Sequence, residues 1–198
     1  MTSDRATAAP LGSVALLERA MGYTLGSLHL VTPEAMSRPS PCHGWDLRAL
    51  LAHMDDALVA LQEAAERARV GLDGPSGADA SRDGLDPVAR LRVRGCRLLG
   101  AWTRADGSRR ISIGGRTLPA SVLTSAGALE VAVHGWDVAR ACGQRRPVPD
   151  ALALGLLVIA PLLVTEADRG VRFAPPVDLP SSAGPSDQLI AYLGRDPR

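Results

Sequence analysis

One uninterrupted helical stretch, residues 119–143, most constrains what this chain can fold into. Its sequence is PASVLTSAGALEVAVHGWDVARACG. Pro119 suits the first helical position, where its missing N–H costs no hydrogen bond, and Gly143 suits a left-handed residue just beyond the last turn. The apolar residues keep the three-and-four spacing of an amphipathic helix. We therefore expect a helix whose buried stripe includes Val122, Ala126, Leu129 and Val133.

Glu130 and His134 lie beside that stripe, one helical turn apart. Residues i and i+4 are only about 40° apart around a helix axis, so a carboxylate and an imidazole at these positions can converge on one metal ion. The alternative is an ordinary Glu–His pair, which on an exposed helix face contributes about 0.2–0.5 kcal/mol. The pair alone leaves both interpretations open.

The same apolar spacing recurs along the chain and predicts an antiparallel bundle of long helices. Asp46 and Asp86 are suitable N-caps for two of them, and Val148-Pro149 opens the last one, whose apolar residues lie nearly all round and predict central burial. Residues 109–118, RRISIGGRTL, alternate around a Gly-Gly turn and predict a hairpin too small to make a sheet. Three of the other expected helices span about residues 13–31, 47–70 and 150–168. A fourth begins at Pro87, and a short one lies near residues 186–193.

These elements predict one all-α domain over residues 1–198, a four-helix bundle with a small β-hairpin and a C-terminal strap formed by the irregular tail. With 46% hydrophobic residues in a chain of 198, a single substantial core can be buried. The segment from Gly71 to Asp86 is rich in glycine, serine and aspartate, and we expect it to be a flexible connection.

Charge and cysteine content narrow the function classes. The formal net charge is +1, so no overall field favours nucleic acid or an anionic membrane. Three widely spaced cysteines without a Cys-x-x-Cys pair argue against a disulfide framework or a thiolate zinc knuckle. The first dozen residues lack a signal-peptide pattern, and the longest apolar run, residues 151–164, is too short to span a bilayer. We expect a cytoplasmic monomer or homodimer that binds neither nucleic acid nor membrane.

His53 forms a candidate metal site together with Glu130 and His134. It lies at the shoulder of the apolar stripe of the helix expected over residues 47–70. Two imidazoles and one carboxylate suit zinc, and three protein ligands leave one position open, as in catalytic rather than structural sites. Asp56, three residues beyond His53, is a candidate to line the same cavity or to close that position. Asp137 is a candidate to orient a ligand through a hydrogen bond.

Other polar residues near these helices receive simpler interpretations. Cys42, close to a helix N-terminus, is interpreted as a half-buried structural thiol, and His43 as a weak alternative ligand on a loop. Arg90, Arg94 and Arg97 lie on one side of the helix that starts at Pro87, where a solvated face is the simplest interpretation. A surface that recognises a carboxylate-bearing ligand is the alternative.

Three segments resemble a known family: PSPCHGWDLRALLAH, GALEVAVHGWDVARACGQ and DQLIAYLGRDP. They are similar to actinobacterial DinB-like metal-binding proteins related to mycothiol-dependent maleylpyruvate isomerase. The resemblance implies a DinB-like four-helix bundle in which a histidine of the second helix and a Glu-x-x-x-His pair of a later one hold a divalent metal. His53, Glu130 and His134 match those positions. The chain resembles short relatives without a C-terminal domain, and it departs from the family at Met54-Asp55-Asp56, where relatives have small apolar residues and glycines.

The resemblance also implies the chemistry of the site. The metal would be zinc, or another divalent metal such as Ni²⁺ or Fe²⁺, and a low-molecular-weight thiol such as mycothiol would be the cosubstrate. Its sulfur would take the open metal position, lose its proton and attack a small electrophilic molecule, as an isomerase if sulfur later leaves or a transferase if it stays. Two alternatives use the same ligands: a hydrolase or lyase with metal-bound water, and a non-catalytic metal-binding protein that binds a partner.

Overall fold

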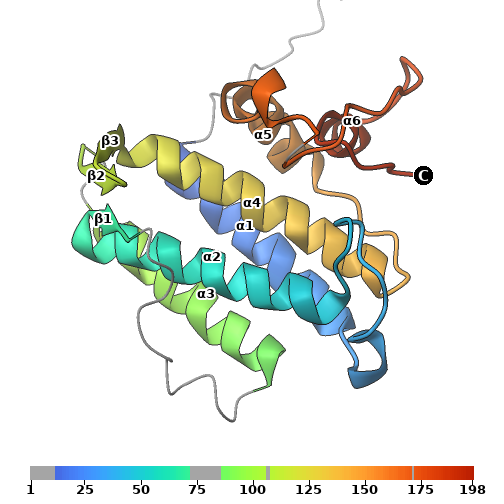
Figure 1. Cartoon of the computed structure of the whole chain (residues 1–198), viewed down its shortest axis with the longest axis horizontal. Coiled ribbons are helices and arrows are strands. Elements are labelled where there is room, and N and C mark those ends of the chain that lie inside the picture. The colour runs from blue at the N-terminus through green and yellow to red at the C-terminus, as the bar shows by residue number, and fades with distance from the viewer. Residues whose placement is uncertain (1–11, 72–85, 106–107, 171) are drawn as a thin grey trace, which may run out of the picture.

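Four long helices form a bundle, with two further helices packed outside it (Figure 1). The computed structural model describes residues 12–71, 86–105, 108–170 and 172–198. Within the bundle, the first helix packs mainly against the fourth, and the second packs against the third. The predicted all-α bundle with a small hairpin and a C-terminal strap is confirmed. The helices are α1 (Ser13–Ser27), α2 (Leu47–Arg67), α3 (Pro87–Arg104), α4 (Ala120–Ala141), α5 (Asp150–Leu163) and α6 (Pro185–Tyr192).

Caps fix the helix starts as the sequence predicts. The Asp46 carboxylate accepts a hydrogen bond of 2.8 Å from the Ala49 amide at the start of α2, and Asp86 accepts one of 3.0 Å from Ala89 at the start of α3. Each bond satisfies an amide that the first helical turn would otherwise leave unpaired. Just beyond the C-terminal end of α4, Gly143 has φ +76°, the left-handed conformation expected after the last turn of a helix.

A three-stranded sheet lies at one end of the bundle, so the prediction that the hairpin is too small to make a sheet is wrong. Ala68 adopts a left-handed conformation, φ 54°, and ends α2 before the predicted residue 70. The next two residues, β1 (Arg69–Val70), pair in parallel with β2 (Arg110–Ile113), which pairs antiparallel with β3 (Arg116–Pro119). The sequence of the hairpin alone could not show that the residues after α2 pair with it as a third strand.

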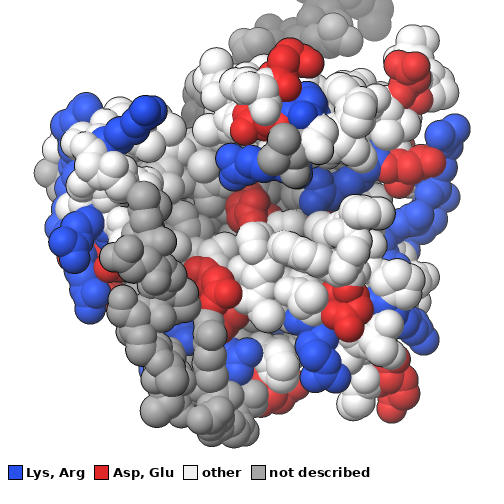
Figure 2. Space-filling view, viewed as in Figure 1, with Lys and Arg blue, Asp and Glu red and all other residues white. Residues whose placement is uncertain are grey.

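Charge is unevenly spread over the surface despite the small net charge. Arginine side chains gather over the small sheet at the left of Figure 2, where Arg69, Arg110 and Arg116 are exposed. On the third helix, by contrast, two of the arginines considered above point inward to a buried carboxylate. Arg90 and Arg94 lie 3.0 and 2.6 Å from oxygens of Asp55, which is 2% exposed. These two arginines neutralise a buried charge and do not form a free anion-binding face.

The position of α5 corrects a prediction: it is not buried at the centre. It packs on α6, α4 and α1 from outside, through buried Leu152, Leu156 and Ala160. The opposite face is open, because nothing in the described part of the chain covers it. The apolar residues on all sides of this helix therefore led to an overestimate of its burial. The side chains exposed on the open face are Leu154 (54%), Val158 (71%) and Leu162 (78%).

Two further helices are shorter than the sequence suggested, and each is followed by a 3₁₀ turn. α1 stops at Ser27 and continues as a 3₁₀ turn, Leu28–Leu30, in place of a helix to residue 31. α5 stops at Leu163, and a separate 3₁₀ turn, Glu166–Asp168, follows it. Helices frequently end in such turns. A further 3₁₀ turn, Pro33–Ala35, lies between α1 and α2.

A close approach of α1 and α4 holds the middle of the bundle together. A Cβ atom at Gly135 would collide with Thr24, so only glycine lets the two backbones come this near. The Thr24 hydroxyl is buried and donates a hydrogen bond of 2.7 Å to the Val131 carbonyl across the same contact. This contact fixes the stretch of α4 that contains the candidate ligands.

Two expectations concern segments that the structure does not describe. Most of the expected flexible connection, residues 72–85, lies outside the described residues, and so do residues 1–11, where no signal peptide was expected. Within the described ranges, every helix is too short or too polar to cross a membrane.

Candidate metal centre

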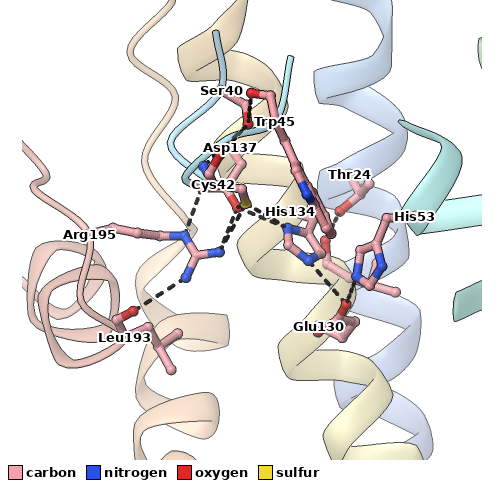
Figure 3. Close-up of polar contacts among 11 residues, drawn as sticks. Thr24, Ser40, Cys42, Trp45, His53, Glu130, His134, Asp137, Leu193 and Arg195 are labelled. Atoms are coloured by element: carbon pink, nitrogen blue, oxygen red, sulfur yellow. Dashed lines mark hydrogen bonds and ion pairs between the residues drawn. The ribbon is translucent and has the colours of Figure 1, made fainter. Parts of the chain in front are cut away.

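Two helices bring the predicted ligands together. His53 projects from α2, and Glu130 and His134 project from α4 toward it (Figure 3). A Glu130 oxygen lies 2.6 Å from His53 Nε2 and 3.0 Å from His134 Nε2. The two imidazole rings stand edge to face, with centroids 5.0 Å apart. His53 and Glu130, 77 positions apart in the sequence, thus meet, although helical spacing predicted only that Glu130 and His134 would converge.

The three ligand atoms form a group with the dimensions of a metal site. One atom from each of His53, Glu130 and His134 lies within 4.8 Å of the other two. Neutral imidazole nitrogens and a carboxylate oxygen are ligands that zinc and other divalent transition metals accept. A cation at their centre would replace the two hydrogen bonds of Glu130. The donor set and its spacing therefore fit a divalent metal.

One side of the group is open to solvent. The side chains of His53 and Glu130 are 38% and 37% exposed, whereas that of His134 is only 9% exposed. The Trp45 ring stands beside His53, with centroids 4.9 Å apart, and forms one edge of the opening. Asp56 is exposed on α2 and belongs to neither of the two groups of converging ligand atoms found among the described residues. This arrangement leaves the outward side of the group for water or a ligand.

Charge in this cluster favours a cation at its centre. Burial alone would raise the pKa of Glu130, but hydrogen bonds from His134 and His53 outweigh it and hold that pKa far below its usual range. Burial would lower the pKa of His134, but bonds to Asp137, Cys42 and Glu130 raise it well above its usual range. The carboxylates on both sides of His134 thus attract positive charge, which a proton supplies when no metal is bound.

Asp137 and Arg195 support His134 from the opposite side. Asp137 is fully buried one turn along α4, and its Oδ2 lies 2.9 Å from His134 Nδ1. Arg195, from the C-terminal segment, donates to both oxygens of Asp137 at 2.8 Å each. Burial would raise the pKa of Asp137, but the adjacent charge of Arg195 and the bond from His134 lower it, so the carboxylate is ionised.

Cys42 belongs to a second group that fits a metal less well. Its thiol donates to Asp137 at 3.3 Å and lies 3.8 Å from His134 Nδ1, so these three residues also bring ligand atoms together. However, Arg195 lies against the same atoms, 3.5 Å from the Cys42 sulfur. A positive guanidinium already compensates the Asp137 charge, and a metal ion there would face electrostatic repulsion. Cys42 is half-buried, as expected for a structural thiol.

The cavity on the inward side is small and apolar. It borders Glu130 and His134 and has a volume of about 10 Å³, which is roughly the space of one water position. A thiol and a second substrate do not fit there, so any such ligands must approach from the solvent side. The remaining lining comes from α1, the 3₁₀ turn after it, α2, α3 and α4: Met21, Thr24, Leu28, Met54, Ala57, Leu58, Leu91 and Val131.

Sequence reasoning identified the cluster but missed Arg195. The only signal for this residue was its place in the C-terminal segment DQLIAYLGRDP, one of the three segments that resemble the family, and that segment alone indicates no role for it. The weak alternative ligand, His43, is exposed on its loop and belongs to neither converging group among the described residues. Asp137 occupies the position from which it was expected to orient a ligand.

Known structures share this fold. The crystal structure of the mycothiol-dependent maleylpyruvate isomerase matches with a TM-score of 0.55 at 22% identity, over 72% of this chain and 65% of that one. A variant of that enzyme with a histidine replaced by alanine matches with a TM-score of 0.52 at 21% identity, over the same shares. This chain therefore spans about two thirds of the isomerase, and at this identity the likeness establishes the fold.

Sequence comparison identifies the family. An uncharacterized protein of Mycobacterium tuberculosis, present in the CDC 1551 and H37Rv strains, is 26% identical over 183 residues, or 91% of this chain and 96% of the relative. The family model described as the mycothiol maleylpyruvate isomerase N-terminal domain matches residues 17–139, more than half of the chain. The matched range contains all three candidate ligands. The chain therefore belongs to the family of the mycothiol maleylpyruvate isomerase N-terminal domain.

Proposed function

We propose that this chain is a divalent-metal enzyme that activates a low-molecular-weight thiol for attack on a small electrophilic molecule. The observation that carries the proposal is the convergence of His53, Glu130 and His134, within 4.8 Å, on a side open to solvent. Three ligands with an open position are typical of catalytic zinc sites. Zinc is the proposed metal, and nickel or ferrous iron would accept the same donors.

The donor atoms and charges of the candidate ligands determine the chemistry that the proposed site would support. A bound zinc ion would lower the pKa of a coordinating thiol, so that the reactive thiolate forms near neutral pH. His53 and His134 contribute neutral donors and Glu130 one negative charge, which leaves a net charge of about +1 to attract anionic sulfur. Asp137 holds the His134 ring, and Trp45 gives the opening an aromatic edge. Cysteine ligands would remove that attraction, because each adds negative charge.

The proposed thiol is mycothiol, and the reaction an isomerisation or a thiol transfer. Membership of a family described by a mycothiol-dependent isomerase supports this choice. The solvent-side opening supports it too, since the inward cavity of about 10 Å³ is too small for either reactant. An isomerisation would return the thiol at the end of the cycle, whereas a transfer would leave it on the product.

Metal content tests the site directly. Protein purified without added metal should contain about one equivalent of a divalent metal, and His134→Ala should lose it. His43→Ala is the matched control, because His43 is an exposed histidine on the neighbouring loop, outside the converging group. We expect this control to retain the metal. Metal-free wild-type protein, or a His134→Ala variant that keeps its metal, would overturn the assignment.

Cobalt substitution tests the thiol. Co²⁺ in place of zinc should give an intense sulfur-to-metal charge-transfer band when mycothiol is added, and Glu130→Ala should weaken that band. Mass spectrometry of metal-loaded protein with mycothiol and candidate electrophiles then distinguishes a returned thiol from a transferred one. If saturating mycothiol leaves the cobalt spectrum unchanged while the protein turns over substrate, thiol coordination is wrong and hydrolysis by metal-bound water replaces it.

A further inference from the structure

The C-terminal segment makes a sharp turn that only glycine allows. After α6, Gly194 has φ +78°, and a Cβ atom at this position would collide with the Ala174 carbonyl. The Gly194 amide donates to the Ala191 carbonyl at 3.0 Å, and the Arg195 amide donates to the Ile190 carbonyl at 3.1 Å. This is the Schellman pattern of helix ends. It turns the chain back toward α4 immediately before Arg195.

The turn delivers the Arg195 side chain to the buried face of α4 behind His134 (Figure 3). Only 13% of this side chain is exposed. Its guanidinium donates 2.8 Å hydrogen bonds to both oxygens of Asp137, and another of 3.3 Å to the Leu193 carbonyl. A planar guanidinium bonded to both oxygens fixes the plane of a carboxylate, which a single point charge does not. The tail therefore sets the orientation of Asp137.

Asp137 in turn sets the orientation of His134. An ionised carboxylate only accepts hydrogen bonds, so the hydrogen of the 2.9 Å contact must lie on His134 Nδ1. The other ring nitrogen, Nε2, then faces Glu130 at 3.0 Å, on the side where His53 also points. Rotation of the Asp137 carboxylate would release the ring. Three side chains thus form one chain of contacts from the C-terminal turn to the candidate metal position.

We infer that Arg195 is a positioning residue for the metal centre, acting through Asp137 on His134. This inference rests on the proposed metal site and assigns a role to the turn at Gly194 and Arg195 beyond packing the tail onto the core. A purely structural role would be different: Arg195 would then only attach the tail, and its loss would alter stability without altering the metal. The geometry of the bound metal distinguishes the two roles.

The test compares cobalt binding by wild-type protein, Arg195→Gln, Arg195→Lys and a control, Arg198→Gln. Arg198 lies on the same segment, and its side chain is far more exposed than that of Arg195. It pairs with the exposed Asp196 at 2.9 Å. Loss of an outer partner of a metal-bound histidine typically reduces affinity 10–100-fold. Because Arg195 acts one contact further away, we expect Arg195→Gln to weaken Co²⁺ affinity about tenfold and to change its ligand-field spectrum. Arg198→Gln should match the wild type.

The lysine variant keeps the inference testable if the glutamine variant does not fold. Lysine supplies the charge but cannot hold both oxygens of Asp137, so its spectrum should differ from wild type with a smaller loss of affinity. Circular dichroism of each metal-free variant checks the fold. If folded Arg195 variants bind Co²⁺ with wild-type affinity and spectrum, the positioning role is wrong although the metal site stands. If wild-type protein binds no Co²⁺, the metal site itself is wrong and the inference falls with it.

Discussion

Replacing Gly135 by alanine should destabilise the protein, although alanine is the better helix former. The substitution adds one methyl group at the contact between α1 and α4, next to His134. Its Cβ would collide with Thr24, with the Thr24 Cα 3.1 Å away. The backbone at Thr24 cannot rotate away as a long side chain can. The two helices must therefore separate, or Thr24 must give up its 2.7 Å hydrogen bond to the Val131 carbonyl.

The expected magnitude follows from three contributions. Inserting atoms into a packed core costs about 1–3 kcal/mol. Weakening a buried hydrogen bond costs about 1 kcal/mol. Replacing glycine within a helix by alanine returns about 1 kcal/mol. The net change for Gly135→Ala is therefore a destabilisation of about 1–3 kcal/mol.

Gly22→Ala is the matched control. Gly22 lies on the exposed face of α1, and its added Cβ would have no neighbour within 4 Å. Only the helix-propensity gain remains there, so this variant should be stabilised by about 1 kcal/mol. Urea unfolding followed by circular dichroism measures both changes, and equal slopes against urea would show that the same transition is compared. If Gly135→Ala gains stability as Gly22→Ala does, the close helix contact is not the constraint we describe.

Three further predictions address pH, packing and capping. Burial would raise the pKa of Asp137, but the charge of Arg195 lowers it. This carboxyl therefore stabilises the fold at pH values above its unfolded pKa of about 3.9. That stabilisation is lost as the pH falls through the lower folded pKa. Metal-free Asp137→Asn should therefore show a shallower loss of stability below about pH 4 in acid titrations, and an unchanged slope would contradict this. Leu156→Ala, at a fully buried position of α5, should cost about 2–5 kcal/mol, whereas Leu162→Ala, 78% exposed, should change the unfolding midpoint little; equal effects would refute the position of α5. Asp46→Ala should cost about 1 kcal/mol by removing the cap of α2, and a midpoint equal to that of wild type would show that the cap is dispensable.

Helix ends and the residues that share a helix face could be predicted from the sequence, because they depend on residues only a few positions apart. Asp46 and Asp86 mark helix starts because their side chains bond to amides only three residues away. Gly143 marks a helix end because its φ of +76° suits glycine. Glu130 and His134 share a face because helical geometry places them there. The spacing of apolar residues on α2 also predicted His53 at the core edge, and the structure shows it on the side that faces α4.

Tertiary partners explain what the sequence could not show. The third strand was missed because Arg69–Val70 form a strand only by pairing with β2, more than forty residues further along the chain. The burial of α5 was overestimated because periodicity reports an apolar surface and not the element that covers it. Arg195 was missed because its partner, Asp137, lies 58 positions away, and an arginine near a chain end has no periodic pattern.

The open face of α5 has a practical consequence for thermal-stability screening. Leu154, Val158 and Leu162 are 54–78% exposed at successive turns of one helix, so the part of the fold that the structure describes presents a contiguous apolar strip. Environment-sensitive dyes report unfolding by their fluorescence on newly exposed apolar surface. Here such a dye would bind the native state and raise the starting signal. Intrinsic fluorescence of the three tryptophans is the better signal for following metal-dependent changes in melting temperature.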